Sequence, residues 1–523
     1  MGGVFITISF DTLKNKILGC WNGKNIGGVL GAPHESWRRV NNVSFYEQNL
    51  SSLPPNDDLD LQLVWLAAVE RFGNRVDAQI LGDYWQSFVI PNWSEYGTGK
   101  RNLAAGMLPP LSGSVNNTYA ESCGAFIRSE IWACLCPGHP DTAVRYAYED
   151  ACVDHGGEGI YGEVFFAAVE SAAFVENDKY KLIDIGLSYI PENCMTAKGI
   201  RLAIKCFEDG MTWKDARVRV MTDIPGSFGV QNTTRGVAEH YPVIPGCDAP
   251  NNIALAILGW MYGEDDFGKS LCIAVNGGED TDCTAATLGA VLGIIHGNDG
   301  LPKKWTDPVG GKIVCGCADQ TMTLELPKTV EELTERIIRQ IPLFLGQKSR
   351  YGKLTKDYWC DPLGDYGVET AENMYCENEH FAYEGTCSWE NDRLVRDLLK
   401  FSPYTVKQQF TCFEAAIDYM DEPFISVGRQ KKIRFMLKDN KFSGHQLWAD
   451  VRLHLPDGVR CLQGNRFSVP IKRMYLNKTV LELDIIAEEP KCGRVDMLFD
   501  VGIHGRASYG VMKGCLYLTA SAD

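Results

Sequence analysis

The sequence predicts a mainly α-helical domain followed by a smaller antiparallel β-sandwich. From residue 10 to about 350, apolar residues recur at helical spacing, in runs of roughly 10 to 20 residues separated by Gly, Pro and Asn. From about residue 425 the pattern changes to short alternating runs such as KKIRFML, LWADVRLHL and TVLELDII, with PDG and LNK turns between them. A chain of 523 residues is also too long for one ordinary core. We therefore expect a helical domain over residues 1–355, a connecting region over 356–424 that could lend strands to the next domain, and a β-sandwich over 425–523.

The composition narrows the classes of protein that fit this chain. Its apolar share of 45% is that of a folded globular protein, and its net charge of −16 argues against a nucleic-acid-binding surface, which concentrates Lys and Arg. The chain opens with no signal-peptide pattern, and no stretch approaches the ~20 apolar residues of a membrane span. We expect a cytoplasmic protein with no nucleic-acid and no membrane partner.

The cysteines do not form a recognisable metal or disulfide pattern. There are 19 of them, an odd number, and none forms a C-x-x-C pair. The C-x-C pairs Cys134/Cys136 and Cys315/Cys317 lack the flanking ligands of a zinc module. We expect most of these residues to be reduced, buried, small hydrophobic side chains.

Two rows of glycines stand out in the helical part. Each interior glycine costs a helix about 1 kcal/mol relative to alanine, so a row on one helix face indicates that another backbone comes very close. The glycines that recur four residues apart are Gly19, Gly23, Gly27 and Gly31 in the first row and Gly289, Gly293 and Gly297 in the second. We interpret both rows as packing surfaces.

Two acidic clusters open apolar helices. One lies in PPNDDLDLQLVWLAAVERFG, with Asp57 and Asp58, and the other in NGGEDTDCTAATLGAVLGIIHG, with Asp280 and Asp282. Either cluster alone fits ordinary helix capping, since an acid in a first turn gains roughly 0.3 to 1 kcal/mol from the helix dipole. Four carboxylates brought together would repel strongly unless a cation neutralised them, and oxygen ligands suit Mg2+, Mn2+ or Ca2+. Spacing alone does not show whether the clusters meet.

These residues lie in segments that resemble the ADP-ribosylglycohydrolase (ADP-ribosyl-acceptor hydrolase) family. GKNIGGVLGAPHE, which ends at Glu35, is similar to the family pattern G-x-x-x-G-D-x-x-G-x-P-x-E. NDD at 56–58 resembles the T-D-D motif, and GEDTDC at 278–283 resembles G-G-D-T-D-T. SEYGTGKRNLAAGMLPPLSG and VDHGGEGIYGEVFFAA resemble a bacterial branch with a C-terminal β-domain. The resemblance covers about residues 10 to 350.

The resemblance implies an orthogonal all-α domain whose central cleft holds one or two Mg2+ ions, with Mn2+ or Ca2+ as other candidates. It also implies hydrolysis of an N- or O-glycosidic bond to ADP-ribose. Among the departures from the family patterns, Asn56 and Cys283 replace threonines and Glu279 replaces a glycine. The implied metal ligands are Asn56, Asp57, Asp58, Asp280, Asp282 and Cys283.

Glycoside hydrolysis passes through an oxocarbenium-like transition state, so it needs negative charge beside the anomeric carbon, an activated water and assistance to the leaving group. A metal ion supplies the nucleophile by lowering the pKa of a bound water. The candidate catalytic residues are Glu35 as acid or base, with Asp58 and Asp280 beside the metal. The candidate substrate-binding residues are Arg128, His155 and Glu279.

Other functions fit the same sequence. The altered motifs and the β-sandwich also fit a glycoside hydrolase of this fold acting on a carbohydrate or nucleoside glycoside. A non-catalytic ADP-ribose-binding protein is a third alternative, which the surviving Asp280 and Asp282 argue against. The expected partner is thus a small-molecule glycoside or an ADP-ribosylated acceptor. The sandwich is interpreted as a buttress or a dimer surface, and the oligomeric state stays open.

Overall fold

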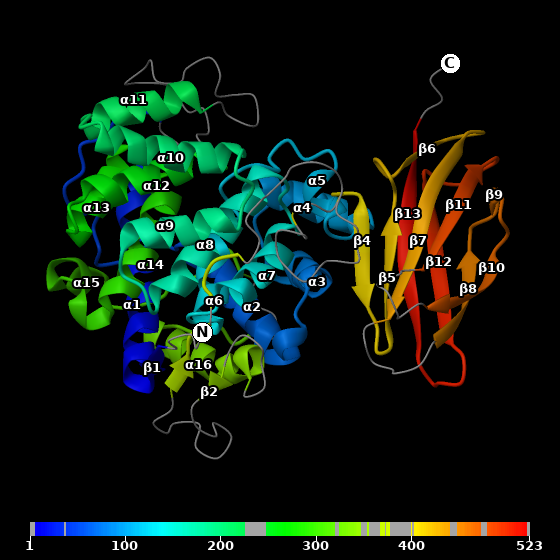
Figure 1. Ribbon diagram of the computed structural model, residues 1–523. Coiled ribbons are helices and arrows are strands. Elements are labelled where there is room, and N and C mark those ends of the chain that lie inside the picture. The colour runs from blue at the N-terminus through cyan, green and yellow to red at the C-terminus, as the bar shows by residue number, and fades with distance from the viewer. Residues whose placement is uncertain are drawn as a thin grey trace.

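A computed structural model shows a large helical body with a β-sandwich at one side of it (Figure 1). The structure describes residues 6–35, 38–224, 247–318, 324–346, 353–354, 367–371, 373–376, 399, 402–439, 447–471 and 479–519. This architecture confirms the predicted mainly α-helical fold with a C-terminal antiparallel β-domain. None of the described helices combines the length and the apolar character that crossing a membrane requires.

The helical body contains α-helices and short 3-10 helices (η). In chain order these are α1 (Phe10–Gly31), η1 (Ala32–His34), α2 (Asp57–Phe72), η2 (Gly73–Arg75), α3 (Ala78–Phe88), α4 (Ser94–Ala104), α5 (Leu111–Ser114), η3 (Phe126–Arg128), α6 (Ser129–Leu135), α7 (Pro140–Ala151), α8 (Glu158–Ala173), α9 (Lys179–Ser188), α10 (Met195–Glu208), α11 (Trp213–Asp223), α12 (Ala249–Tyr262), α13 (Phe267–Asn276), α14 (Thr281–His296), η4 (Asn298–Gly300), α15 (Lys303–Val309) and α16 (Val330–Leu345). Short strands β1 (Thr7–Ser9), β2 (Lys353–Leu354) and β3 (Gly367–Glu369) form a small antiparallel sheet beside it.

Helices α1 and α14 pack with their backbones in direct contact. A methyl group added at Gly23 would meet the carbonyl oxygen of Gly289, and one added at Gly19 would meet that of Gly293. The reciprocal positions on α14 are equally closed, so neither row tolerates even alanine without a shift. The predicted packing role of the glycine rows is confirmed, and this contact fixes the start of α14 against the end of α1.

A buried ion pair joins α1 to α6. The Lys24 ammonium group lies 2.8 Å from the Glu130 carboxylate of α6, and both side chains are fully buried. Lys24 also donates to the carbonyl oxygen of Ile127 at 2.9 Å. Such a pair is strongly destabilising to break, because one charge would be left buried alone. It therefore holds α1, α6 and η3 in one arrangement.

The sandwich consists of two five-stranded sheets. Their strand orders are β10-β8-β12-β13-β6 and β4-β5-β7-β11-β9, and the pairs are antiparallel except β13 with β6. The strands are β4 (Thr405–Gln409), β5 (Phe413–Asp418), β6 (Phe424–Ser426), β7 (Gln430–Asp439), β8 (Leu447–His454), β9 (Val459–Cys461), β10 (Arg466–Ile471), β11 (Thr479–Ala487), β12 (Arg494–Ile503) and β13 (Tyr509–Thr519). The stacked rings of Phe435 and Phe499, 4.1 Å between centroids, join the two sheets.

The sandwich begins before the boundary expected at residue 425. Strands β4 and β5 lie in the region 356–424 and pair with each other, and β5 also pairs with β7. The side chains of β5 are buried for five residues in succession, so this strand lacks the alternation that marks a half-exposed strand. The two strands therefore belong to the sandwich rather than to a separate connection.

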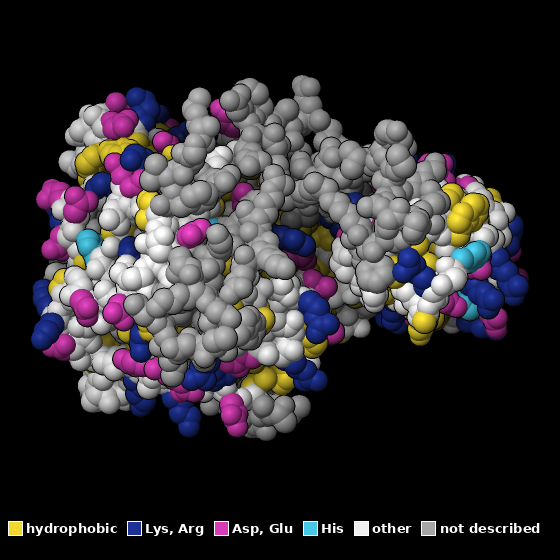
Figure 2. Space-filling view, turned by 60° about the horizontal axis from the view of Figure 1, so that its bottom comes forward, with side chains coloured by type: hydrophobic (Ala, Val, Ile, Leu, Met, Phe, Trp, Pro, Cys, Tyr) yellow, Lys and Arg dark blue, Asp and Glu magenta, His cyan; other side chains and the backbone are white. Residues whose placement is uncertain are grey.

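The segment between α4 and α5 joins the two bodies. Arg494 and the Tyr517 hydroxyl both donate to the carbonyl oxygen of Ala105, at 2.8 and 2.7 Å. Met107 and Leu111 are buried within the apolar core of the sandwich. Figure 2 shows that Lys and Arg side chains are interspersed with Asp and Glu over the visible surface of both bodies. The sandwich is thus packed directly against the helical body.

Candidate functional site

The two acidic clusters meet in space at the N-termini of α2 and α14. Oxygen atoms of Glu35, Asp280 and Asp282 lie within 4.8 Å of one another. Asp58 and Asp282 form a second such group with the thiol of Cys283. Asp58, Asp280 and Asp282 are buried, whereas Glu35 is exposed and lies just after η1. The structure therefore joins residues that are separated by more than 200 positions in the chain.

Local structure aims these side chains into the site rather than at the helix backbone. Asn56 and Asp280 occupy the N-cap positions of α2 and α14, but neither side chain makes a capping hydrogen bond among the described residues. The backbone N–H of Asp280 instead donates to the Asn252 side chain at 3.0 Å. A methyl group at Gly28 would collide with the Asn56 side-chain amide, so glycine leaves room for it. Ordinary capping thus fails to explain either residue.

Among the described residues, no Lys or Arg side chain forms an ion pair with these carboxylates. Asp58 Oδ2 and Asp280 Oδ1 are buried and have no hydrogen-bond partner in the described part of the chain. Burial raises the pKa of Asp58 to about 8, against the opposing effect of Lys24. Burial and the charges of Glu35 and Asp58 raise the pKa of Asp282. Orphaned buried carboxylate oxygens with mutual repulsion fit a divalent cation.

Glu35 and Asp57 complete the acidic rim of the site. Desolvation by the surrounding protein and the charge of Asp280 raise the pKa of Glu35 to about 8, although part of its side chain is exposed. Burial and the same aspartate raise the pKa of the half-buried Asp57. Glu35 can therefore exchange a proton with solvent while it faces the buried carboxylates.

Two thiols also face the carboxylates, and one of them has no signal in the local sequence. The Cys123 thiol donates to Asp280 Oδ2 at 2.9 Å, and the Cys283 thiol donates to Asp58 Oδ1 at 3.3 Å. Cys283 is part of the recognised motif, whereas Cys123 is 157 residues from Asp280. The other cysteines follow the expectation more simply, since those described are free thiols and most are buried.

Asp60 lies next to the cluster, but its carboxylate binds backbone groups of a neighbouring loop. Its Oδ2 accepts hydrogen bonds from the backbone N–H groups of Gly316 and Cys317 at 2.6 and 2.8 Å. It thereby holds the loop after α15 against the start of α2. The acidic run in α2 is thus divided between a structural residue and residues that face the site.

Arg128 is placed in the helical core rather than on a ligand-contacting loop. Its guanidinium group lies 3.0 Å from Asp150 and 2.9 Å from Asp154, and the side chain is fully buried. A further hydrogen bond goes to the carbonyl oxygen of Gly124 at 2.8 Å. With its donors occupied inside the protein, Arg128 does not offer the free bidentate face that a phosphate needs.

Glu279 is likewise buried, although it lies beside the metal-type motif. It accepts hydrogen bonds from Arg38, with a closest separation of 2.7 Å, and Arg217 lies 3.9 Å away. Its φ of +70° is a left-handed conformation, which the arginine pairs hold in place. Glu279 therefore fixes the turn into α14 rather than presenting a carboxylate to the cleft.

His155 links the Arg128 cluster to a carboxylate that the sequence did not single out. Its Nδ1 lies 2.9 Å from Asp154 and its Nε2 lies 3.0 Å from the Ser122 hydroxyl. Burial raises the pKa of Glu95, while His155 and a hydrogen bond from Ser122 oppose that rise. Ser122 directly precedes Cys123, so this chain of contacts orients the segment that carries the thiol.

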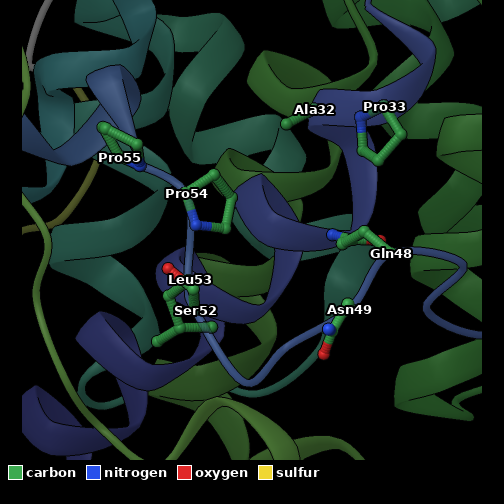
Figure 3. Close-up of a pocket in the computed structure, with 8 residues that line it drawn as sticks. All are labelled: Ala32, Pro33, Gln48, Asn49, Ser52, Leu53, Pro54 and Pro55. Atoms are coloured by element: carbon green, nitrogen blue, oxygen red, sulfur yellow. The ribbon is translucent and has the colours of Figure 1, made fainter.

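A surface pocket of about 510 Å3 borders the segments that lead into the site. Figure 3 shows Ala32 and Pro33 on one side and Pro54 and Pro55 on the other, with Gln48 below Pro33. Pro33 is two residues before Glu35, and Pro55 directly precedes Asn56. The pocket itself has no acidic lining residue, so it is a candidate for the less polar part of a ligand.

Together, the fold and the site define an α-helical protein with a buried carboxylate centre of the kind that holds divalent cations. The chain belongs to the ADP-ribosylglycohydrolase family, whose model matches residues 9–342, more than half of the chain. Membership in this family implies a hydrolase. The described strands β2 to β13 lie C-terminal to the matched range.

Two individual proteins are each similar to part of this chain. An uncharacterized protein of Archaeoglobus fulgidus is 22% identical over 345 residues, which cover 62% of this chain and 99% of that protein. A solved structure described as an ADP-ribosylglycohydrolase-related protein complex is 18% identical, with a TM-score of 0.39, and covers 64% of this chain and 99% of its own.

Proposed function

We propose that this protein is a metal-dependent hydrolase that releases ADP-ribose from an ADP-ribosylated acceptor by cleaving an N- or O-glycosidic bond. The observation that carries the proposal is the convergence of Asp58, Asp280 and Asp282 at two helix N-termini, with buried oxygens that have no partner among the described residues. Family membership supplies the class of reaction.

The proposed cation ligands are the oxygens at the two helix N-termini. Asp57, Asp58, Asp280 and Asp282 would supply carboxylates, and Asn56 a carbonyl oxygen. Such a set suits one or two Mg2+ ions, and Mn2+ or Ca2+ would fit the same oxygens. A bound cation supplies an activated water and fixes the hydroxyl or diphosphate oxygens of the ligand.

The proposed acid–base group is Glu35. It is the exposed carboxyl group of the cluster, and its pKa of about 8 allows it to hold or accept a proton near neutral pH. Asp58 and Asp280 would stabilise the positive charge that develops at the anomeric carbon and orient the attacking water. Glu35 would then protonate the leaving group or take the proton of the water.

The proposed roles of the remaining candidates are indirect. Arg128 and His155 would position Ser122, Cys123 and Glu95 through the buried contacts described above. Glu279 would hold the turn before Asp280 through Arg38. None of the three has an exposed polar face for a substrate, which is the reason for assigning them to support rather than to binding.

Turnover of ADP-ribosyl-arginine, compared with a panel of aryl glycosides in the presence of Mg2+, tests this proposal. We expect release of ADP-ribose, and loss of turnover of at least ~100-fold in Glu35→Gln, the lower range for a positioned acid or base. Asp299→Asn, at an exposed aspartate of η4, is the matched control and should keep full activity.

The alternatives predict different outcomes in the same assay. Turnover of aryl glycosides alone would replace the proposal with a carbohydrate or nucleoside glycosidase. Binding of ADP-ribose without turnover of any substrate would favour a binding protein. Near wild-type activity of Glu35→Gln would remove Glu35 from the acid–base role.

A further inference from the structure

The metal-type centre has two chemically different halves. One group of ligand atoms, from Glu35, Asp280 and Asp282, contains only oxygens and includes the exposed residue. The other groups contain thiols: Cys123 and Cys283 with Asp280, and Cys283 with Asp58 and Asp282. The thiol-containing half is buried throughout, because Cys123 and Cys283 are 3% and 7% exposed.

The two thiols are not ordinary core cysteines. Cys136 represents the ordinary case. It is a fully buried free thiol, and its thiol donates to no carboxylate among the described residues. Cys123 and Cys283 instead each donate to a carboxylate oxygen of the site, at 2.9 and 3.3 Å. In both aspartates concerned, the other oxygen is buried and has no hydrogen-bond partner within the described residues.

Thiol protons therefore occupy positions between sulfur and carboxylate where a metal ion could replace them. A sulfur and oxygen donor set disfavours Mg2+, which demands oxygen ligands, and favours a borderline ion of the Zn2+ type. Zn2+ prefers four ligands, and a site with three protein ligands leaves the fourth position to water. Cys123, Cys283 and Asp280 offer three donor atoms within 4.8 Å of one another, and Asp58 lies beside them, 3.3 Å from the Cys283 thiol.

We propose that the buried half of the centre binds a borderline transition-metal ion such as Zn2+ through Cys123, Cys283 and Asp280, with Asp58 beside them, next to the all-oxygen half for which Mg2+ is proposed. This proposal deepens the proposed function, since it names the metal of the same site. It does not depend on the identity of the substrate, because binding of the ion is measurable without turnover.

The test is a titration of the full, reduced, metal-free chain with Co2+, followed by displacement with Zn2+. Co2+ is the spectroscopic substitute for Zn2+, and thiolate ligation gives a near-ultraviolet charge-transfer absorption that oxygen ligands do not. We expect that absorption to appear with one equivalent of Co2+, to vanish when Zn2+ is added and to persist in excess Mg2+. A reductant in the buffer prevents oxidation of Cys123 and Cys247. These two residues are neighbours, because the backbone N–H of Cys123 donates to the backbone carbonyl of Cys247.

Three variants make the test specific. Cys123→Ala and Cys283→Ala should each abolish or halve the absorption. Each should also lower the affinity for Zn2+ by more than the ~10–100-fold that follows loss of a residue hydrogen-bonded to a ligand. Cys136→Ala, which removes a buried thiol elsewhere, should leave both unchanged. Cys283→Thr, which restores an oxygen and is expected to fold, should lose the thiolate absorption while it keeps Mg2+ binding.

The results separate this inference from the proposed function. Co2+ bound without the thiolate absorption, or Zn2+ affinity that neither cysteine variant changes, would overturn the inference. If ADP-ribose then still binds with Mg2+, the proposed function stands without it. A thiolate absorption in a protein that binds no ADP-ribose would support the inference and count against the proposed function.

Discussion

Two clusters of buried acidic residues lie in the same helical core, and the protein neutralises only one of them. Around Arg128, the carboxylates of Asp150 and Asp154 lie 3.0 and 2.9 Å from the guanidinium group. At the N-termini of α2 and α14, no described arginine pairs with Asp58, Asp280 or Asp282, and the nearby Lys24 is paired with Glu130. Within the described residues, the second cluster therefore has no counter-charge dedicated to it.

The pKa values of Asp154 and Asp58 differ accordingly, although burial still raises the pKa of Asp150 beside Arg128. Burial alone would raise the pKa of Asp154, but Arg128 and His155 reverse the effect and the pKa is lowered. Burial raises the pKa of Asp58 to about 8, and the neighbouring acids add to the rise while Lys24 only partly opposes it. The comparison shows how to separate a structural acidic cluster from a ligand site: by asking which charges the protein itself balances.

Removal of the balancing arginine should give the largest effect. Arg128→Met leaves Asp150 and Asp154 buried without their arginine, and we expect a loss of about 3–5 kcal/mol in the free energy of unfolding. Denaturant unfolding measures it, with Arg219→Met as the control, because the exposed Arg219–Asp223 pair should contribute less than about 1 kcal/mol. A loss for Arg128→Met as small as that of the control would end the distinction between the clusters.

Removal of a carboxylate from the other cluster should act in the opposite direction. In the metal-free protein, Asp282→Asn relieves repulsion among buried acids, so its Tm should equal or exceed that of the wild type. Saturating Mg2+, at ~100 times its Kd, should stabilise the wild type by about 2.7 kcal/mol and the variant far less. Thermal unfolding with and without Mg2+ measures both, and a metal-free variant less stable than the wild type would contradict the account.

The pH dependence of metal stabilisation should give the smallest effect. Asp58 and Glu35 have pKa values of about 8 in the folded protein, against 3.8 and 4.5 ordinarily. Raised acid pKa values stabilise the fold at low pH, and that stability is lost as the pH rises toward about 8. Because Mg2+ competes with protons for the same oxygens, the gain in Tm on adding Mg2+ should be larger at about pH 9 than at about pH 6.

Asp282→Asn supplies the check on that pH effect. With one ligand removed, the gain in Tm from Mg2+ should be small at both pH values. A wild-type gain that is greatest at about pH 6, where the carboxyl groups are protonated, would show that Mg2+ acts elsewhere on the protein.

The sequence predicts the fold and the oxygen ligands better than it predicts their surroundings. Helical spacing and the glycine rows give the helical body and the α1–α14 contact, because these signals are local. The acidic motifs mark helix N-termini for the same reason. Spacing does not show that Cys123 reaches Asp280 or that Arg128 lies among carboxylates, because both depend on which distant segments meet.

The most direct test of the central claim is a calorimetric titration of ADP-ribose into the protein with and without Mg2+, repeated with Asp280→Ala and Asp282→Ala. The account predicts binding that requires Mg2+ and that both substitutions abolish, since the cation held by these aspartates would fix the ligand. Binding that persists without any divalent cation, or in both folded variants, would contradict it.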